Sequence, residues 1–286
     1  MTTAISRSRW VAKKVARRGL ALGASWARRL SPPRGPSAAR VVTYHRFGDL
    51  QRDPFAVSAR DFERHVAHLA GAGLAVSLSE IERFVAGQTD LRDGSVLVTI
   101  DDGFESLLRV AAPILARHGV PAVAFVAAGR IGTGHPADVP ERFLTFDELS
   151  RVEAHGVEIA SHGLTHRSLG ALGLAAAREE ALRSRELLES TLGHAVTALA
   201  YPYGMRGDHT PETRAILGEA GYRVAFTAEH GPVRAGDDAL TLTRVKVEGG
   251  DPDWLFPALC GGAMDGWRHV EGAIATTGRV LARGAP

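Results

Sequence analysis

Two adjacent carboxylates stand directly after a short apolar run, and they are the first residues in the chain with an obvious capacity for chemistry. Asp101, Asp102 and Gly103 follow the run VLVTI at residues 96–100. Because functional groups gather at the carboxyl ends of parallel strands, one aspartate could hold a metal while the other takes a proton. The alternative is a plain turn, in which Asp and Gly reverse the chain.

A pair of histidines follows another predicted strand end. His162 and His166 lie in the segment SHGLTH, after the predicted strand at 157–160. Their spacing of four residues would put both imidazoles on one side of a helical turn, where they could share a metal. A surface pair with no ligand is the alternative for the two histidines alone. Together with one aspartate they make a set of two histidines and one carboxylate, which suits zinc or another divalent ion.

The segment AYPYG at residues 200–204 follows the next predicted strand. Pro202 and Gly204 would form a tight turn that could aim the backbone N–H of Tyr203 at a developing oxyanion. The alternative is a structural turn with aromatic packing. By itself this motif therefore indicates little.

A histidine also ends the first predicted strand, in the segment YHRF at residues 44–47. His45 could act as an acid near neutral pH, with Asp49 close to it in the chain. A lone histidine is more often a structural residue, so this position depends on support from the other motifs.

Predicted strands and helices alternate through the chain and would bring these motifs to one end of a sheet. We predict strands at 41–45, 74–77, 96–100, 123–126, 157–160, 196–200, 224–226 and 240–247. We predict helices at 58–70, 79–86, 105–118, 145–155, 174–192 and 211–220. Repeated strand–helix units imply parallel strands with right-handed crossovers. About seven strands favour a distorted (β/α) barrel, an α/β fold.

The composition is that of an ordinary globular protein, but its charge is uneven. The 286 residues are 45% hydrophobic and 23% charged, with a net charge of +2. Residues 1–40 hold ten Lys or Arg and no Asp or Glu. Because the basic charge is confined to this segment, we expect no nucleic-acid partner. Cys260 is the only cysteine, which excludes an internal disulfide framework and a multi-cysteine zinc site.

We predict three regions: a basic extension with a Pro/Gly linker at 1–37, a catalytic domain at 38–250, and a helical tail at 251–286. Residues 1–36 could form an amphipathic segment on an anionic membrane, or an extension without a partner. The apolar membrane contacts would be Trp10, Val11, Leu20, Leu22, Trp26 and Leu30. A faint likeness of residues 17–27 to a twin-arginine signal leaves secretion open, although no good cleavage site follows. The favoured location is the cytoplasm, at the membrane face.

With these motifs placed, residues 40–247 resemble the polysaccharide deacetylases, the NodB-homology family grouped as carbohydrate esterase family 4. TIDDG is similar to that family's T-F-D-D-G, with Ile100 in place of Phe. SHGLTH is similar to S-H-[ST]-x-x-H, with Gly163 in place of Ser or Thr. AYPYG is similar to R-x-P-Y-G, with Ala200 in place of the arginine. VVTYHRF resembles a permuted branch in which the strand of the catalytic acid lies at the N-terminus.

The resemblance implies hydrolysis of acetyl groups from N-acetylated sugars, whether a poly- or oligosaccharide or a glycan precursor. It implies a divalent metal, Zn²⁺ first, with Co²⁺ or Ni²⁺ as other choices. The resemblance implies that Asp101 acts as the base and that Asp102, His162 and His166 bind the metal. It implies that the Tyr203 amide contacts the oxyanion and that His45 acts as the acid. The implied substrate contacts are Tyr201, Pro202 and Arg244. Arg244 could also replace the charge lost at Ala200. The alternatives are an O-acetyl esterase, another C–N hydrolase on the same scaffold, or a glycan-binding protein without catalysis.

Overall fold

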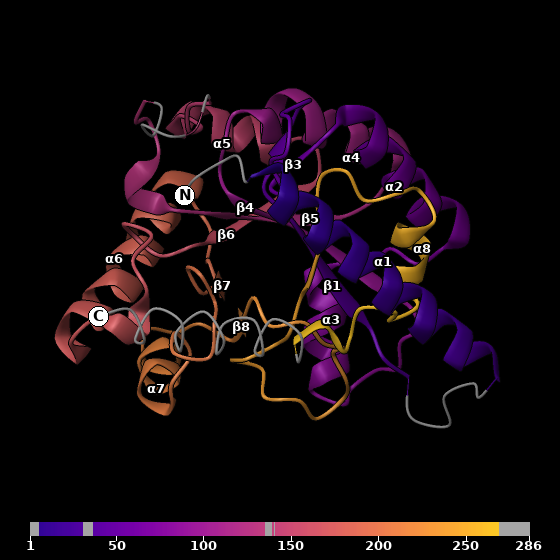
Figure 1. The fold of residues 1–286 in the computed structure, drawn as a ribbon. Coiled ribbons are helices and arrows are strands. Elements are labelled where there is room, and N and C mark those ends of the chain that lie inside the picture. The colour runs from indigo at the N-terminus through magenta and orange to yellow at the C-terminus, as the bar shows by residue number, and fades with distance from the viewer. Residues whose placement is uncertain (1–5, 31–36, 135–138, 140, 269–286) are drawn as a thin grey trace, which may run out of the picture.

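Seven parallel strands form one curled sheet with helices on its outer side, in the order β8-β7-β6-β5-β4-β1-β9 (Figure 1). The computed structural model describes residues 6–30, 37–134, 139 and 141–268, without the side chains of Arg28 and Arg29. The strands are β1 (Arg40–Tyr44), β4 (Val96–Asp102), β5 (Ala122–Val126), β6 (Val157–Ser161), β7 (Ala198–Ala200), β8 (Val224–Phe226) and β9 (Val245–Lys246). A small second sheet pairs β2 (Arg46–Phe47) with β3 (Ala56–Val57). The predicted distorted barrel is confirmed as a half-barrel.

Several of the helices begin or end at capping residues that can be recognised in the sequence. The helices are α1 (Arg7–Leu30), α2 (Ala59–Ala72), α3 (Leu78–Val85), α4 (Ala112–His118), α5 (Phe146–Glu153), α6 (Leu174–Leu192), α7 (Pro211–Glu219) and α8 (Leu255–Cys260). Ser77 and Glu80 form a reciprocal capping box at the start of α3. Gly73 ends α2 in the left-handed conformation, at φ 60°.

Strand alternation divides the core between the two faces of the sheet. In β4, Val96, Val98 and Ile100 join the large cluster beneath the outer helices. Leu97 joins the inner cluster, with Phe125 of β5 among its members. Because side chains alternate along a strand, Asp101 lies on the same inner face as Leu97.

Three predicted elements differ from the structure. Residues 74–77 form no strand, only a single parallel bridge from Ala75 to Val96, because Ser77 already caps α3. The predicted helix 105–118 begins as a π-helix at Leu107–Ala111 and becomes α4 close to Pro113, which has no N–H to donate to the helical ladder. The predicted strand 240–247 shrinks to β9, with one further bridge at Leu242.

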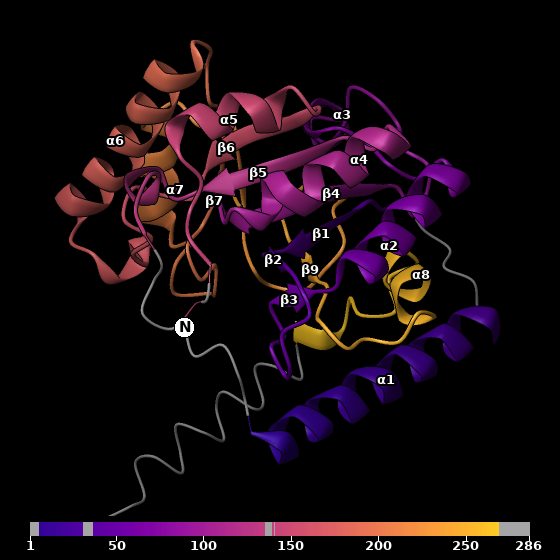
Figure 2. The same ribbon diagram turned by 90° about the horizontal axis from the view of Figure 1, so that it is seen from above.

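The basic N-terminal segment forms the long helix α1, which packs beside α8 (Figure 2). Lys14 and Arg17 are buried and pair with Glu248 and Asp251 after β9. Among the described helices, none combines the length and the hydropathy needed to cross a bilayer. The predicted linker at 31–36 and most of the predicted tail, from residue 269 on, lie outside the described residues.

Candidate active site

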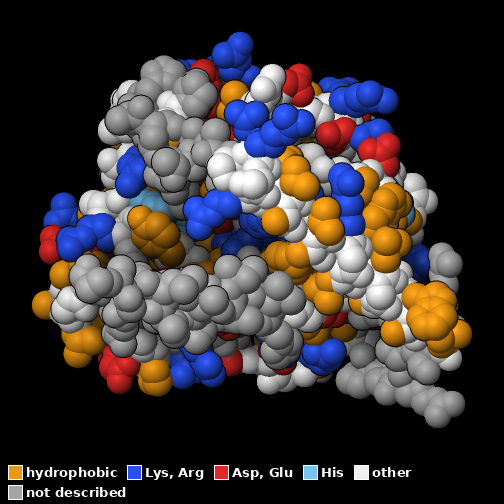
Figure 3. Space-filling view, viewed as in Figure 1, with side chains coloured by type: hydrophobic (Ala, Val, Ile, Leu, Met, Phe, Trp, Pro, Cys, Tyr) orange, Lys and Arg blue, Asp and Glu red, His pale blue; other side chains and the backbone are white. Residues whose placement is uncertain are grey.

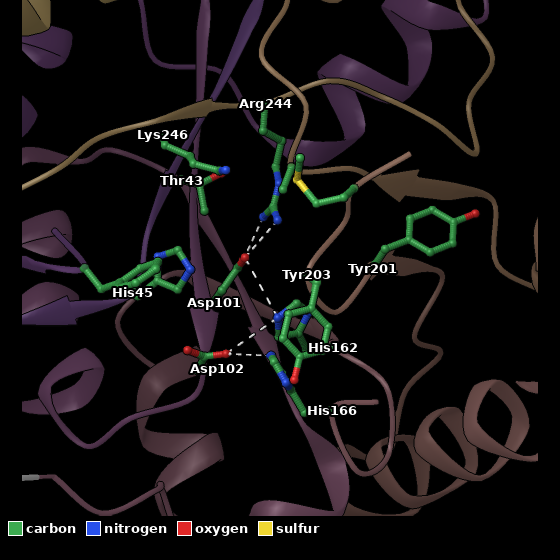
Figure 4. Close-up of a pocket in the computed structure, with 13 residues that line it drawn as sticks. Thr43, His45, Asp101, Asp102, His162, His166, Tyr201, Tyr203, Arg244 and Lys246 are labelled. Carbon is green, nitrogen blue, oxygen red and sulfur yellow. Dashed lines mark hydrogen bonds and ion pairs between the residues drawn. The ribbon is translucent and has the colours of Figure 1, made fainter. Parts of the chain in front are cut away.

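A cavity of about 210 Å³ lies at the carboxyl ends of the strands and collects almost every predicted site residue (Figure 4). Its walls come from β1, β4, β9 and the loops after β6, β7 and β8. The lining residues are Thr43, His45, Phe55, Asp101, Asp102, His162, His166, Tyr201, Tyr203, Met205, Ala228, Arg244 and Lys246. Of the predicted residues, only Pro202 is not part of the lining.

Asp102, His162 and His166 form a buried cluster whose potential ligand atoms all lie within 4.8 Å of one another. Asp102 Oδ1 is 3.2 Å from His166 Nε2 and 3.6 Å from His162 Nε2. His162 Nδ1 is 2.8 Å from the carbonyl oxygen of Ala200. A carbonyl can only accept, so Nδ1 carries the proton and Nε2 keeps a lone pair directed toward Asp102. This donor set fits a divalent cation.

Burial and charge act together to keep His162 and Asp102 in the forms that can coordinate a metal. Burial lowers the pKa of His162 to about 4, so the imidazole is neutral near pH 7. For Asp102 burial alone would raise the pKa, but the hydrogen bond from His166 and the neighbouring imidazoles lower it well below its ordinary value. The carboxylate is therefore ionised and able to coordinate.

Three of the site residues have a backbone conformation that side-chain-bearing residues rarely adopt. The φ angles are 75° at Asp102, 63° at His166 and 63° at Tyr203. At Asp102 the positive φ interrupts strand alternation, so its carboxylate reaches the same cavity as that of Asp101. Strain of this kind persists only where the surrounding structure enforces it, and it is concentrated at functional sites.

The loop after β6 is not helical, so the predicted helical turn for His162 and His166 is wrong. A tight loop brings the two rings together instead, with their centroids 4.8 Å apart. Glu180 of α6 stabilises this loop. Its carboxylate accepts hydrogen bonds from the backbone N–H of Leu164 and Thr165 and from the Thr165 hydroxyl. Glu180 is buried, and no local sequence motif marks it as part of the site.

Asp101 forms a two-point ion pair with Arg244 across the inner face of the sheet. The two carboxylate oxygens accept from Nη1 and Nη2 at 2.7 and 2.8 Å. Arg244 Nε donates to the carbonyl of Thr227 at 2.8 Å, which orients the guanidinium. Burial alone would raise the pKa of Asp101, but the charge of Arg244 lowers it overall. The charge that is missing at Ala200 is thus supplied from near β9, as the sequence predicted.

His45 lies across the cavity from the histidine cluster, with the two aspartates between them (Figure 4). Its ring packs edge-on against Phe55, at 4.8 Å between centroids. Burial lowers the pKa of His45, and the charges of Asp102 and Asp101 oppose that shift. Asp49, which the sequence placed near it, is exposed.

The aromatic and proline residues of the segment after β7 differ in their exposure and in their contacts. The ring of Tyr203 is 50% exposed and packs against His166, at 5.1 Å between centroids. Tyr201 is buried, and its hydroxyl donates to the carbonyl of Leu240. Pro202 is buried beside Gly163. Direct substrate contact by Tyr201 or Pro202 stays a prediction.

Five lining residues were not singled out from the sequence, and two of them carried a usable signal. Thr43 precedes His45 by two residues, and Lys246 follows Arg244 by two. In an extended chain such neighbours share a face. The other three, Phe55, Met205 and Ala228, lie in loops and follow no periodic pattern.

The fold and the sequence both match known deacetylases. Residues 88–225 match the sequence model of the polysaccharide deacetylase family. YxkH of Bacillus subtilis, which carries a provisional polysaccharide deacetylase name, is 25% identical over 78% of this chain and 76% of its own. The solved structure of IcaB from Ammonifex degensii is 26% identical, with a TM-score of 0.68 over 79% of this chain and 97% of that one.

A further relative is the poly-β-1,6-N-acetyl-D-glucosamine N-deacetylase of Staphylococcus aureus, which is 23% identical over 167 residues. The match spans 54% of each chain, so this chain covers about half of that enzyme's length. Over residues 88–225 the chain therefore matches the polysaccharide deacetylase family, which is consistent with a hydrolase that acts on carbon–nitrogen bonds.

Proposed function

We propose that the protein is a metal-dependent deacetylase that removes acetyl groups from N-acetylated sugars in a poly- or oligosaccharide or a glycan precursor. One observation carries this proposal: the Asp102–His162–His166 cluster lies beside an anionic Asp101 that Arg244 holds at both oxygens. The N-acetyl specificity in the printed name of the Staphylococcus aureus relative supports the choice of substrate class.

Asp102 and the two histidines would hold the metal, and the chemistry of the donor set favours Zn²⁺, with Co²⁺ or Ni²⁺ as other occupants. A divalent cation there would make a bound water more acidic and polarise the acetyl carbonyl. The proton on His162 Nδ1 is already committed to Ala200, so its Nε2 is free for this role.

Asp101 is the group we assign as base. Its carboxylate is ionised, and the two-point contact with Arg244 keeps it in one orientation next to the cluster. Because the charge of Arg244 lowers the pKa of Asp101, the carboxylate carries no proton near pH 7 and is available as an acceptor. The backbone N–H of Tyr203 is the group we assign to the oxyanion.

His45 is the group we assign as acid, since it faces the aspartates from the other wall of the cavity (Figure 4). Its imidazolium would donate a proton to the leaving amine nitrogen of the sugar. The cavity, at about 210 Å³, is smaller than the roughly 300–1,000 Å³ of drug-sized ligand sites. We therefore expect it to take the acetylated sugar residue itself, with the remainder of a glycan outside.

The test is acetate release from an N-acetylglucosamine oligomer by protein that has been stripped of metal and then given Zn²⁺ or Co²⁺. We expect release only after metal is restored, and its loss in His45→Ala. Release from an O-acetylated sugar but not from the N-acetylated oligomer would reassign the enzyme as an esterase. Glycan binding with no release from either substrate would contradict an enzymatic role.

A further inference from the structure

The helix α1 has two faces of opposite character, and the inner face accounts for much of its basic charge. Lys14 and Arg17 are almost fully buried, at 4% and 0% exposed. They form ion pairs with Glu248 and Asp251 at distances of 2.7 to 3.3 Å. Burial alone would raise the pKa of Glu248, but the neighbouring cations lower it to about 2. The inner face is thus a docked surface with its charges paired.

The outer face of α1 carries a stripe of exposed apolar side chains. Their spacing follows the helical period, and each is between 51% and 66% exposed: Val11, Val15, Leu22, Trp26 and Leu30. Exposed hydrophobic side chains run along the path of α1 in the space-filling view (Figure 3). A row of exposed apolar side chains on the surface of a folded domain, interrupted here by the exposed Arg18 between Val15 and Leu22, marks a contact surface.

The stripe continues onto α8 through a shallow groove. Trp254, 40% exposed, forms part of this groove together with Trp26. The groove has a volume of about 490 Å³ and is lined by Leu22, Ser25, Trp26, Trp254, Pro257 and Ala258. Two exposed tryptophans on one surface suit the boundary between water and lipid, where indole rings concentrate.

The positive charge of α1 indicates which kind of partner could bind its outer face. The helix has eight Lys or Arg and no Asp or Glu. Three of the cations pair with acids on the inner side, while Arg7, Arg9 and Arg18 are exposed. A second copy of the same helix would bring like charges together. An anionic surface is complementary, and it also accepts the apolar stripe.

We propose that the outer face of α1, continued by Trp254, lies in the interface of a lipid bilayer that contains anionic phospholipid. The helix is too polar to span the bilayer and would lie along it, with its apolar stripe at the acyl boundary. Arg17 Nη2 donates to the carbonyl of Lys246, which lines the cavity, so α1 is joined to the wall of the site. Membrane binding would hold the cavity at a fixed position beside the lipid.

The test is sedimentation of the full chain with phosphatidylcholine vesicles that contain about one third phosphatidylglycerol, compared with pure phosphatidylcholine vesicles. We expect binding to the anionic vesicles that weakens as salt is raised. The triple variant Val15→Ser, Leu22→Ser, Trp26→Ser should bind at least about tenfold more weakly, because its apolar contacts are removed. These side chains are exposed, so the variant should keep its fold.

The matched control is Phe146→Ser with Leu174→Ser, which removes exposed apolar side chains from α5 and α6, away from α1 (Figure 2). This variant should bind vesicles like the unmodified chain. Equal binding by the triple variant and the control would overturn the proposal. A dimer in solution that the triple variant loses, with no vesicle binding, would overturn it in favour of self-association. Because vesicle binding is measured without any substrate, its outcome does not depend on whether the protein is a deacetylase.

Discussion

Arg244 and Asp101 form a buried two-point ion pair in which the two guanidinium nitrogens each donate to a different carboxylate oxygen, at 2.7 and 2.8 Å. Both residues are 2% exposed, and Arg244 is oriented in turn by the carbonyl of Thr227. A buried carboxylate keeps its charge only while such a partner is present. The contact therefore connects the stability of the fold to the protonation state of the proposed base.

Replacing the arginine should affect stability and activity together. Arg244→Gln leaves a buried carboxylate without its counter-charge, which costs about 3–5 kcal/mol in the free energy of unfolding. Acetate release should fall at least about a hundredfold, because Asp101 becomes protonated near pH 7. Arg244→Lys should recover part of the stability, since it keeps the charge but not the two-point geometry. Urea unfolding and acetate release measure the two effects, and near-normal turnover in Arg244→Gln would refute the coupling.

At Tyr203 the backbone conformation should make a glycine variant more stable than an alanine variant, the reverse of the usual order in a helix. Because its φ is 63°, Tyr203→Gly should be about 1 kcal/mol more stable than Tyr203→Ala. Arg183, exposed within α6, offers the control: there alanine should be more stable than glycine by about 1 kcal/mol. Thermal or urea unfolding of the four variants provides the comparison. Alanine being the more stable at both positions would show that no strain is present at Tyr203.

Glu180 should control metal affinity without touching the metal. It accepts hydrogen bonds from the loop between His162 and His166, so Glu180→Gln should weaken Zn²⁺ binding about 10- to 100-fold. Glu179→Gln, one residue earlier on α6 and exposed, should leave the affinity unchanged. Competition with a chromogenic chelator measures both variants. Equal affinities would mean that the loop holds its shape without Glu180.

The ion pairs beneath α1 should make stability depend on pH in the acid range. The folded-state pKa of Glu248 is lowered to about 2. An unfolded glutamate titrates near about 4.3. The stabilisation is therefore complete above that value and is lost as the pH falls toward about 2. Glu248→Gln should cost about 3 kcal/mol at pH 7 and about half of that at pH 3, because the folded carboxylate is still mostly ionised there.

The control for this prediction is Glu219→Gln, which alters an exposed pair with Arg178 and should cost under about 1 kcal/mol at either pH. Urea unfolding at pH 3 and pH 7 measures the stability of the unmodified chain and of the two variants, Glu248→Gln and Glu219→Gln. A cost for Glu248→Gln that is the same at pH 3 and pH 7 would contradict the ionised network.

Local patterns were sufficient to predict the sheet and the buried cluster of Asp102, His162 and His166. The apolar run before Asp101 marks a buried strand, and functional groups at strand ends converge whatever the details of the helices between them. The two-residue period would also have identified Thr43 and Lys246 as lining residues.

The features that were not predicted from the sequence depend on contacts between residues that are distant in the chain. The loop that joins His162 to His166 takes its shape from Glu180, which lies 14 residues beyond His166, so a helical turn was the wrong model. The period of α1 shows an amphipathic helix, but the docked face is decided by Glu248, 231 residues from Arg17. The positive φ angles at Asp102 and Tyr203 are likewise imposed by the surrounding fold and have no signal in the residue types.

The most direct test of the account separates the two adjacent aspartates by measuring bound Zn²⁺ and acetate release on the same samples. Asp101→Asn should keep one equivalent of metal and lose turnover, because it removes a proton acceptor but no ligand. Asp102→Asn should lose metal affinity and turnover together. Metal loss in Asp101→Asn, or full activity in Asp102→Asn, would contradict the assignment of base and ligand on which the proposed function depends.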